Sequence, residues 1–248
     1  MSVAAAANIE ETVQPKIEFL LASEEDVSDA IDVFIKAFLR PKIGAPGFGQ
    51  MRIDTEDPSL TQHFLPAFQD ARNNGVLLVA KDEQRGSKVI AFLRARLMSF
   101  DEWRSSRMLS IDPSTHKCFA PLHDFCRMVC VLNREVVRKQ LERMQADQVT
   151  KLAHVVNVAV VPEYRRKGAA TRLLEEFLAT VRRQGFDCVT INAGAVATQR
   201  LVLNLGFESI LKRDYADLID EQCQQIIKPE DPNEKSILCA YKNLGAHP

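Results

Sequence analysis

Apolar and polar residues recur along this chain at spacings that predict a regular succession of strands and helices. Short apolar runs bounded by turn-forming residues are typical of strands, and they occur at Lys16–Ala22, Val76–Lys81, Val89–Ser99, Val155–Val161, Cys188–Asn192 and Ser236–Tyr241. Apolar residues spaced three and four apart predict helices, which open at Ser23–Asp26, span Ser59–Asn74, start again at Ala169 and cover Ala197–Leu205. This order predicts an α/β (α+β) fold with a mixed central β-sheet and helices on both faces.

The same pattern predicts one domain. We expect the Ala-rich residues 1–15 to be disordered and residues 16–248 to form a single domain, because no internal repeat or low-complexity linker divides them. Residues 101–150 are expected to form a helical insertion between two strands. Within it, Asn133–Gln145 carries Arg or Lys and Glu at i,i+4 spacing, which predicts an exposed helix. The Gly/Pro-rich segment Pro41–Pro58 is too long for a simple connector; it either covers a pocket or forms a surface loop.

The stretch with the clearest chemistry is a buried strand, a basic turn and the start of a helix. Val155–Val161 is rich in β-branched residues, Pro162 ends the strand, and Arg165-Arg166-Lys167-Gly168-Ala169-Ala170 follows. The first N–H groups of a helix lack intrahelical partners and carry a partial positive charge. Because Gly168 has no side chain and its neighbours are cationic or small, the turn predicts an anion site suited to phosphate. An ordinary solvated basic turn is the alternative.

Composition limits the classes of partner. The net charge of −1 gives no general attraction to nucleic acid or to an anionic membrane, and no run of 18 apolar residues predicts a membrane span. The six cysteines form no C-x-x-C pair, which favours reduced thiols and a cytoplasmic location and predicts no metal site. Arg94 and Arg96 alternate with apolar residues on one predicted strand, so we expect both to face solvent.

The segment VAVVPEYRRKGAATRLL resembles the acyl-CoA-binding motif of the GCN5-related N-acetyltransferase (GNAT) superfamily, in which Arg/Gln-x-x-Gly-x-Gly/Ala follows a strand. Arg165, Gly168 and Ala170 occupy the patterned positions, and Gly206-Phe207 matches a second family motif. The resemblance implies the GNAT fold over roughly Lys151–Leu211. More loosely, the insertion and the tail resemble the invertebrate arylalkylamine N-acetyltransferase branch.

This resemblance implies acetyl-CoA as the acyl donor. It implies that the strand holds the pantetheine arm, that the turn holds the pyrophosphate, and that a polar residue on the next strand assists. The residues that match these roles are Val158, Ala159, Val160, Arg165, Arg166, Lys167, Gly168, Ala169, Ala170 and Asn192. Arg165 either contacts phosphate or orients the turn, and Asn192 either contacts pantetheine or stabilises a turn.

Candidates for proton transfer are weaker, because a primary amine must lose a proton before it attacks a thioester. His154, at the start of the central strand, is one candidate for the base, and a buried structural histidine is the alternative. The invertebrate branch has a glutamate where this chain has Leu39-Arg40-Pro41, and Glu102 is a possible substitute. The tyrosine acid of many family members falls on Val202 here, which leaves Tyr215 as a candidate.

The sequence therefore predicts an acetyl-CoA-dependent N-acetyltransferase that acts on a small primary amine by direct attack in a ternary complex, with an arylalkylamine as the candidate acceptor. We expect a monomer or weak homodimer with no nucleic-acid or membrane partner. The alternatives are a CoA-binding regulatory module with a degenerate active site and a peptide or protein N-acetyltransferase.

Overall fold

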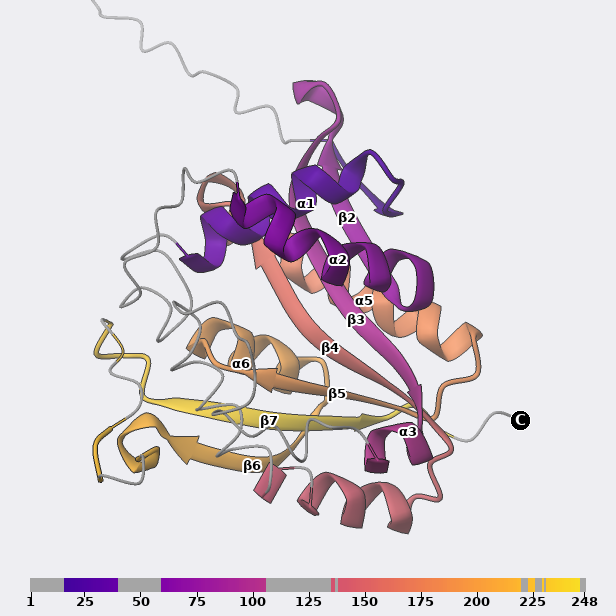
Figure 1. Ribbon diagram of the computed structural model, residues 1–248, viewed down its shortest axis with the longest axis vertical. Helices are drawn as coiled ribbons and strands as arrows, with labels where there is room; N and C mark the ends of the chain where they lie inside the picture. Colours follow the sequence, from indigo (N-terminus) through magenta and orange to yellow (C-terminus); the bar gives the residue numbers. More distant parts are fainter. Residues whose placement is uncertain are drawn as a thin grey trace, which may run out of the picture.

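Within the part of the chain that the structure describes, seven strands form one mixed sheet in the order β1-β2-β3-β4-β5-β7-β6, and only the β4–β5 pair is parallel (Figure 1). The computed structural model describes residues 16–39, 59–105, 135–136, 138–219, 223–225, 229 and 231–245. The strands are β1 (Ile17–Leu21), β2 (Val76–Asp82), β3 (Lys88–Ser99), β4 (Lys151–Val160), β5 (Cys188–Ala193), β6 (Glu208–Asp214) and β7 (Ser236–Asn243). The predicted fold class is confirmed, and β4 begins four residues earlier than predicted.

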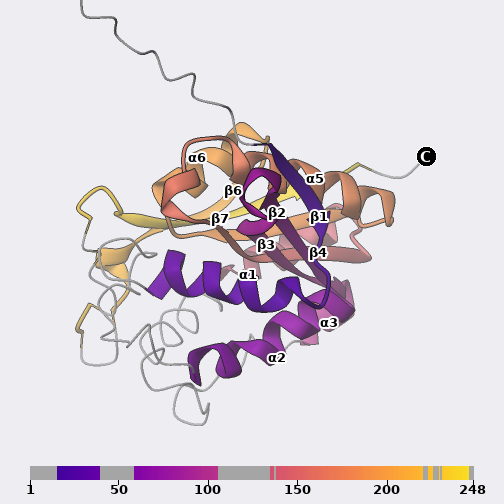
Figure 2. The ribbon, with the colours of Figure 1, turned by 90° about the horizontal axis from the view of Figure 1, so that it is seen from above.

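Helices cover both faces of this sheet (Figure 2). They are α1 (Asp26–Phe34), α2 (Ser59–Asn74), α3 (Phe100–Ser105), α5 (Ala169–Arg183) and α6 (Val196–Asn204). Shorter helical turns are η1 (Ile35–Leu39), η2 (Glu83–Arg85), η5 (Pro162–Tyr164) and η6 (Tyr215–Asp217). In the part of the chain that the structure describes, no helix is long and apolar enough to cross a membrane.

The helix α5 anchors one face of the sheet. Its apolar stripe places Leu173, Leu174, Phe177 and Val181 in the core with no exposed surface. They pack against β2, β3 and β4, and each buried side chain of this size contributes about 1.5–3 kcal/mol. The opposite face is covered by α1 and α2, whose Phe34 and Phe68 rings stand against Phe92 of β3. The sheet is therefore held between two separate apolar layers.

The predicted insertion contributes an amphipathic helix at residues 138–146, whereas residues 106–134 lie outside the described part. The expected exposure holds for one face of this helix, and the other face is buried. Arg138 and Glu142 are exposed and form an i,i+4 ion pair of 3.1 Å, but Gln140 and Met144 are completely buried. Four-residue spacing gives this helix a charged face and an inward face, and Met144 on the inward face packs against Leu152 of β4 and Tyr241 of β7.

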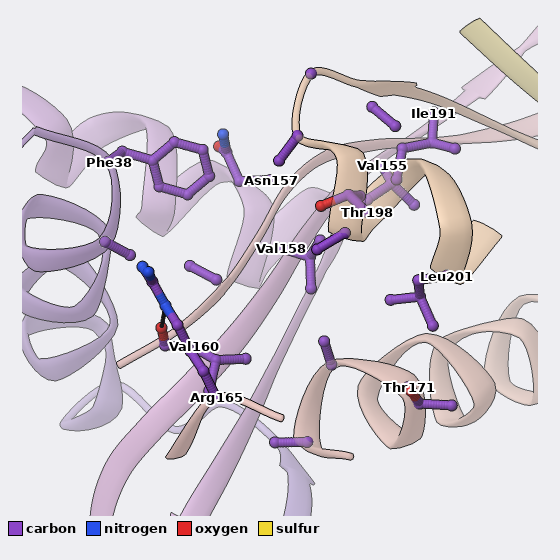
Figure 3. A pocket seen from close by; sticks show the side chains of 18 of the residues that line it. Phe38, Val155, Asn157, Val158, Val160, Arg165, Thr171, Ile191, Thr198 and Leu201 are labelled. Atoms are coloured by element: carbon purple, nitrogen blue, oxygen red, sulfur yellow. Dashed lines mark hydrogen bonds between the residues drawn. The ribbon is translucent and has the colours of Figure 1, made fainter. Parts of the chain in front are cut away.

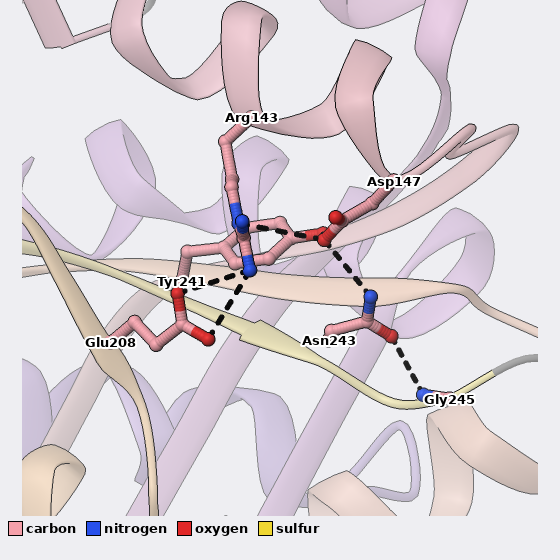
Figure 4. A network of polar contacts seen from close by, with 6 residues as sticks. All are labelled: Arg143, Asp147, Glu208, Tyr241, Asn243 and Gly245. Atoms are coloured by element: carbon pink, nitrogen blue, oxygen red, sulfur yellow. Dashed lines mark hydrogen bonds and ion pairs between the residues drawn. The ribbon is translucent and has the colours of Figure 1, made fainter.

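A polar network fastens this helix to the last strand (Figure 4). Asp147 accepts hydrogen bonds from Tyr241 Oη at 2.7 Å and Asn243 Nδ2 at 2.9 Å, and Arg143 pairs with Glu208 on β6 at 3.2 Å. The hydrogen bond from Tyr241 is the main cause that lowers the pKa of Asp147. The insertion is thus docked on the β6–β7 side of the sheet by both apolar and polar contacts.

Candidate active site

The site arises where β4 and β5 separate. Their parallel pairing runs only from Leu152 opposite Cys188 to Val155 opposite Ile191. Beyond that point β4 continues to Val160 while it stays paired to β3, and β5 stays paired to β7. Figure 1 shows the two strands diverging from their shared start. At residues 156–160, the edge of β4 that faces β5 is consequently left without a neighbouring strand in the described chain, while the other edge stays paired to β3.

A β-bulge causes this divergence. Arg94 of β3 lies opposite Asn157, whereas the next residue, Ala95, lies opposite Val155, so Val156 is an extra residue on β4. A bulge bends its strand and increases the local twist. It also reverses which face the following side chains occupy. Asn157 and Ala159 accordingly face α1 and α2, while Val158 and Val160 pack toward α5.

The separated strands enclose a cavity of about 650 Å³ (Figure 3). Its walls are residues 155–160 of β4, the turn before α5, the end of β5 and the first turns of α6. Ala37 and Phe38 of η1 close one side, and Asp231 and Glu234 line another. Nine of the ten residues predicted to bind the acyl donor line this cavity, and Lys167 does not: its ammonium lies 5.0 Å from the centre of the Tyr164 ring.

The N-terminus of α5 faces this cavity without a side-chain cap. Its N-cap is Gly168, at φ 82° and ψ −2°, which makes no capping hydrogen bond, and no acidic residue occupies the first turn. An N-terminus normally gains a Ser, Thr, Asp or Asn cap. The free N–H groups and the helix dipole therefore suit an anion. The positive φ of Gly168 is a conformation that side-chain-bearing residues adopt at a cost.

The two arginines of the turn differ in their contacts and in their backbone conformation. Arg165 Nε donates to the carbonyl oxygen of Val160 at 3.3 Å, which ties the turn back to the end of β4. Arg166, at φ 62°, adopts the left-handed conformation. Behind them, Tyr164 donates its hydroxyl proton to the buried carboxylate of Asp82 on β2. The turn is thus fixed at both ends before the helix starts.

Asn192, the last polar residue of β5, presents an unsatisfied acceptor. Its Oδ1 atom is buried and has no hydrogen-bond partner among the described residues, although the residue lines the cavity. Buried polar atoms of native proteins nearly always have a partner. An amide N–H on a bound molecule would satisfy this atom, as the pantetheine arm of CoA could.

A hydrogen-bonded pair that the sequence did not reveal stands at the bulge. Arg94 donates from Nε and Nη2 to Asn157 Oδ1 at 3.2 and 2.7 Å, and its guanidinium lies 4.8 Å from the centre of the Phe68 ring. The prediction that Arg94 faces solvent is wrong, because Arg94 shares its face of β3 with Phe92 and α2 covers that face. Burial is the main cause that lowers the pKa of Arg94, to about 10. With Oδ1 engaged, the NH₂ group of Asn157 is the end available to the cavity.

Comparison with known proteins agrees with this geometry. A family model described as "Acetyltransferase (GNAT) family" matches residues 47–207, which is more than half of the chain. The chain belongs to the acetyltransferase (GNAT) family. No curated protein sequence matches this chain significantly.

Solved acetyltransferase structures share its fold. Arylalkylamine N-acetyltransferase 2 from Aedes aegypti has a TM-score of 0.71 and 19% identity, over 92% of this chain and 99% of that one. The Drosophila melanogaster polyamine N-acetyltransferase has a TM-score of 0.70 and 18% identity, over 92% and 100%. Arabidopsis thaliana NAA60 in complex with acetyl-CoA has a TM-score of 0.51 and 15% identity, over 92% and 98%. At these identities the likeness concerns the fold.

Two of the predicted catalytic side chains of this acetyltransferase do not line the cavity and have clear structural partners. His154 is buried, with Nδ1 at 2.8 Å from Thr190 Oγ1 and its ring 5.2 Å from that of Trp103. Glu102 is exposed and accepts from the N–H and hydroxyl groups of Ser99, whose hydroxyl accepts from the Glu102 N–H. This reciprocal arrangement is a capping box at the start of α3. Neither placement supports a role as base.

Tyr215, the third predicted catalytic residue, lies beside the cavity without lining it. Its hydroxyl donates to the carbonyl oxygen of Gly194 at 2.9 Å, and burial raises its pKa well above the usual range. Gly194 itself lines the cavity. Tyr215 therefore supports the wall at the start of α6, and its hydroxyl proton is held by a backbone carbonyl.

Sequence reasoning missed Phe38, Asp231 and Glu234. Phe38 lies in η1, a π-helical turn that widens the end of α1, and its ring stacks on Phe34 at 5.1 Å. Helical spacing alone places Phe38 on the same apolar face as Phe34 and does not reveal the cavity. Asp231 and Glu234 follow a polar tail with no recognisable motif, and only the return of the chain to β7 brings them to the cavity.

The burial of His154 should make the stability of the protein depend on pH. Burial, with a smaller contribution from Arg96, lowers its pKa to about 4, against an ordinary value near 6.5. Between these pH values His154 is protonated in the unfolded chain but neutral in the folded chain, so stability is lost as pH falls from 6.5 toward 4. We expect His154 to account for a loss of about 2 kcal/mol between pH 7 and pH 5. Denaturant unfolding of His154→Asn should lack that share, and an unchanged pH dependence would contradict the assignment.

The Arg94–Asn157 pair makes a second prediction. Asn157→Leu removes the acceptor of a desolvated guanidinium and should cost about 1–3 kcal/mol of unfolding free energy. Arg94→Met alone leaves no buried charge and should cost less. In the double variant most of the Asn157→Leu cost should disappear, because both polar partners are then absent. Additive costs in urea unfolding would show that the pair is not coupled; Lys88→Met, an exposed change on the same strand, is the matched control.

Proposed function

We propose that this acetyltransferase transfers the acetyl group of acetyl-CoA to a small primary amine that binds beside it in the cavity between β4 and β5. The observation that carries the proposal is that a single cavity includes both the gap between β4 and β5 and the uncapped N-terminus of α5. A strand edge can pair with the amide groups of an extended chain such as pantetheine. A helix N-terminus binds phosphate. The two features lie in one cavity in the order that acyl-CoA requires.

Each donor-binding role is assigned to particular groups. The N–H groups at Gly168, Ala169 and Ala170 hold the pyrophosphate, with Arg165 and Arg166 supplying positive charge. Val158, Ala159 and Val160 offer backbone groups to the pantetheine arm, and the orphan Asn192 Oδ1 accepts one of its amide protons. A backbone N–H near Val158 polarises the thioester carbonyl, which stabilises the negative charge that develops on its oxygen during attack.

The acceptor is proposed to bind between the two remaining sides of the cavity. The aromatic ring of Phe38 offers an apolar surface, while Asp231 and Glu234 offer negative charge that attracts a protonated amine. Polyamine and arylalkylamine acetyltransferases both occur among the proteins of similar fold, and these two acceptor classes are therefore the ones to compare. We expect the enzyme to be cytoplasmic and to act as a monomer or weak homodimer.

The proposed pyrophosphate site at the N-terminus of α5 can be tested with substitutions at two glycines. Gly168→Ala and Gly86→Ala both place a side chain at positive φ, 82° and 69°, where the added methyl group meets no atom within 4 Å. Each should lose roughly 1 kcal/mol of stability. Only Gly168→Ala should weaken acetyl-CoA binding, by about tenfold if one charge-assisted hydrogen bond is lost. Equal dissociation constants for the two variants, measured by calorimetry, would contradict the proposed pyrophosphate site.

The activity itself is tested by CoA release from acetyl-CoA with tyramine, dopamine, serotonin, tryptamine, agmatine, spermidine and a basic peptide. We expect turnover with at least one small primary amine and saturation in both substrates. Turnover of the peptide alone would favour a peptide or protein N-acetyltransferase. Tight acetyl-CoA binding with no turnover of any amine would overturn the proposal and favour a CoA-binding regulatory module.

A further inference from the structure

The charged side chains that line the described walls of the cavity are segregated. Arg165 and Arg166 lie on the side of β4 and α5, whereas Asp231 and Glu234 lie where the chain approaches β7. The cationic side suits the phosphates of a CoA donor, and the anionic side suits an ammonium group. A carboxylate on this second side is also the group that amine activation requires.

Glu234 is held rigidly on that side. Its Oε2 atom accepts from the backbone N–H of Val196, the first residue of α6, at 2.7 Å. The backbone around it is fixed because Tyr215 N donates to Lys235 O at 2.8 Å and Gln199 Nε2 donates to Ser236 O at 2.6 Å. No hydrogen bond to Glu234 Oε1 occurs within the described residues, so this oxygen remains available to the cavity.

The strand register and the contact with Val196 place Glu234 on the β5 side of the opening. Val155 and Ile191 are the last pair before the strands part, so the residues after Asn192 face those after Val156 across the opening. Val196, which holds Glu234, follows directly on that β5 side, and Asn157 and Val158 line the other. The phosphate turn lies farther along β4, beyond Val160. Glu234 thus belongs to the acceptor half of the cavity.

We propose that Glu234 is the general base that takes a proton from the acceptor amine, directly or through one water molecule. This inference rests on the proposed function. The ammonium gives one proton to Glu234, which later releases it to solvent. The neutral amine then forms the C–N bond to the acetyl carbon, and the C–S bond breaks. A second amine proton passes to the CoA thiolate. The products are the N-acetylated amine, CoA and one released proton.

The environment of Glu234 is suited to this task. Burial is the largest cause that raises its pKa, the negative charge of Asp231 acts in the same direction, and the hydrogen bond from Val196 opposes both. Burial and, after it, the charge of Glu234 raise the pKa of the Tyr215 hydroxyl. A carboxylate with a raised pKa is a stronger base toward an ammonium ion. Asp231 is the less suitable carboxylate, because it is exposed and its Oδ1 accepts from Asn233 N and Nδ2.

The test uses Glu234→Gln, which keeps an oxygen that can accept from Val196 N–H but cannot take a proton. With the best amine of the panel, kcat/KM should fall by about 10²-fold or more. The acidic limb of its pH profile should disappear, whereas acetyl-CoA affinity and the unfolding midpoint should stay close to wild type. Asp231→Asn removes the neighbouring charge, so it should shift that limb to lower pH and, because Asp231 also attracts the amine, raise the KM for the amine.

A chemical rescue separates catalysis from a purely structural cap on α6. Glu234→Ala should be inactive and should regain turnover in proportion to added formate, a small carboxylate that can replace the missing base. Wild-type activity or an intact acidic limb in Glu234→Gln would overturn the inference while leaving the acetyltransferase activity standing. Failure of formate to rescue a folded, acetyl-CoA-binding Glu234→Ala would also count against it. Absence of wild-type turnover on every amine would instead overturn the proposed function.

Discussion

The extra residue at Val156 is the constraint on which the site depends. Without it, β4 would continue beside β5 as an ordinary parallel pair, and no space would open between them. The bulge turns β4 away while the sheet on either side remains intact, because β3 pairs with β4 and β7 pairs with β5 throughout. The cavity is consequently a gap between two strands, each of which keeps its hydrogen-bonded neighbour on the other side.

The bulge links the two halves of the proposed chemistry. On the α5 side, strand β4 leads through a fixed turn to an uncapped helix N-terminus, which suits the anionic part of a donor. On the α1–α2 side, the reversal of side chains brings Asn157 to Arg94 and places both near the aromatic residues of α1, η1 and α2. The β5 wall contributes Asn192 and the backbone that holds Glu234. One distortion therefore positions donor and acceptor groups together.

Much of this could be predicted from local sequence. Strand and helix periods gave the sheet and its two layers, and the Arg-x-x-Gly-x-Ala turn indicated the donor site because its chemistry is local. The acceptor side could not be predicted in this way. Alternation along β3 does not reveal that α2 covers Arg94, a bulge leaves no mark in the pattern of Val155–Val161, and Glu234 reaches the cavity only through the pairing of β7 with β5. His154 and Glu102 were chosen by residue type, which does not reveal burial or a capping box.

The most direct test of the central claim is a crystal structure of the protein with acetyl-CoA bound. The account predicts the pyrophosphate on the N–H groups of Gly168–Ala170, the pantetheine arm along the β4 edge at residues 156–160, and a pantetheine amide within hydrogen-bond distance of Asn192 Oδ1. The thioester should then lie near Val158, across the opening from Glu234. Acetyl-CoA bound elsewhere, or β4 and β5 closed together with the ligand outside them, would contradict the account.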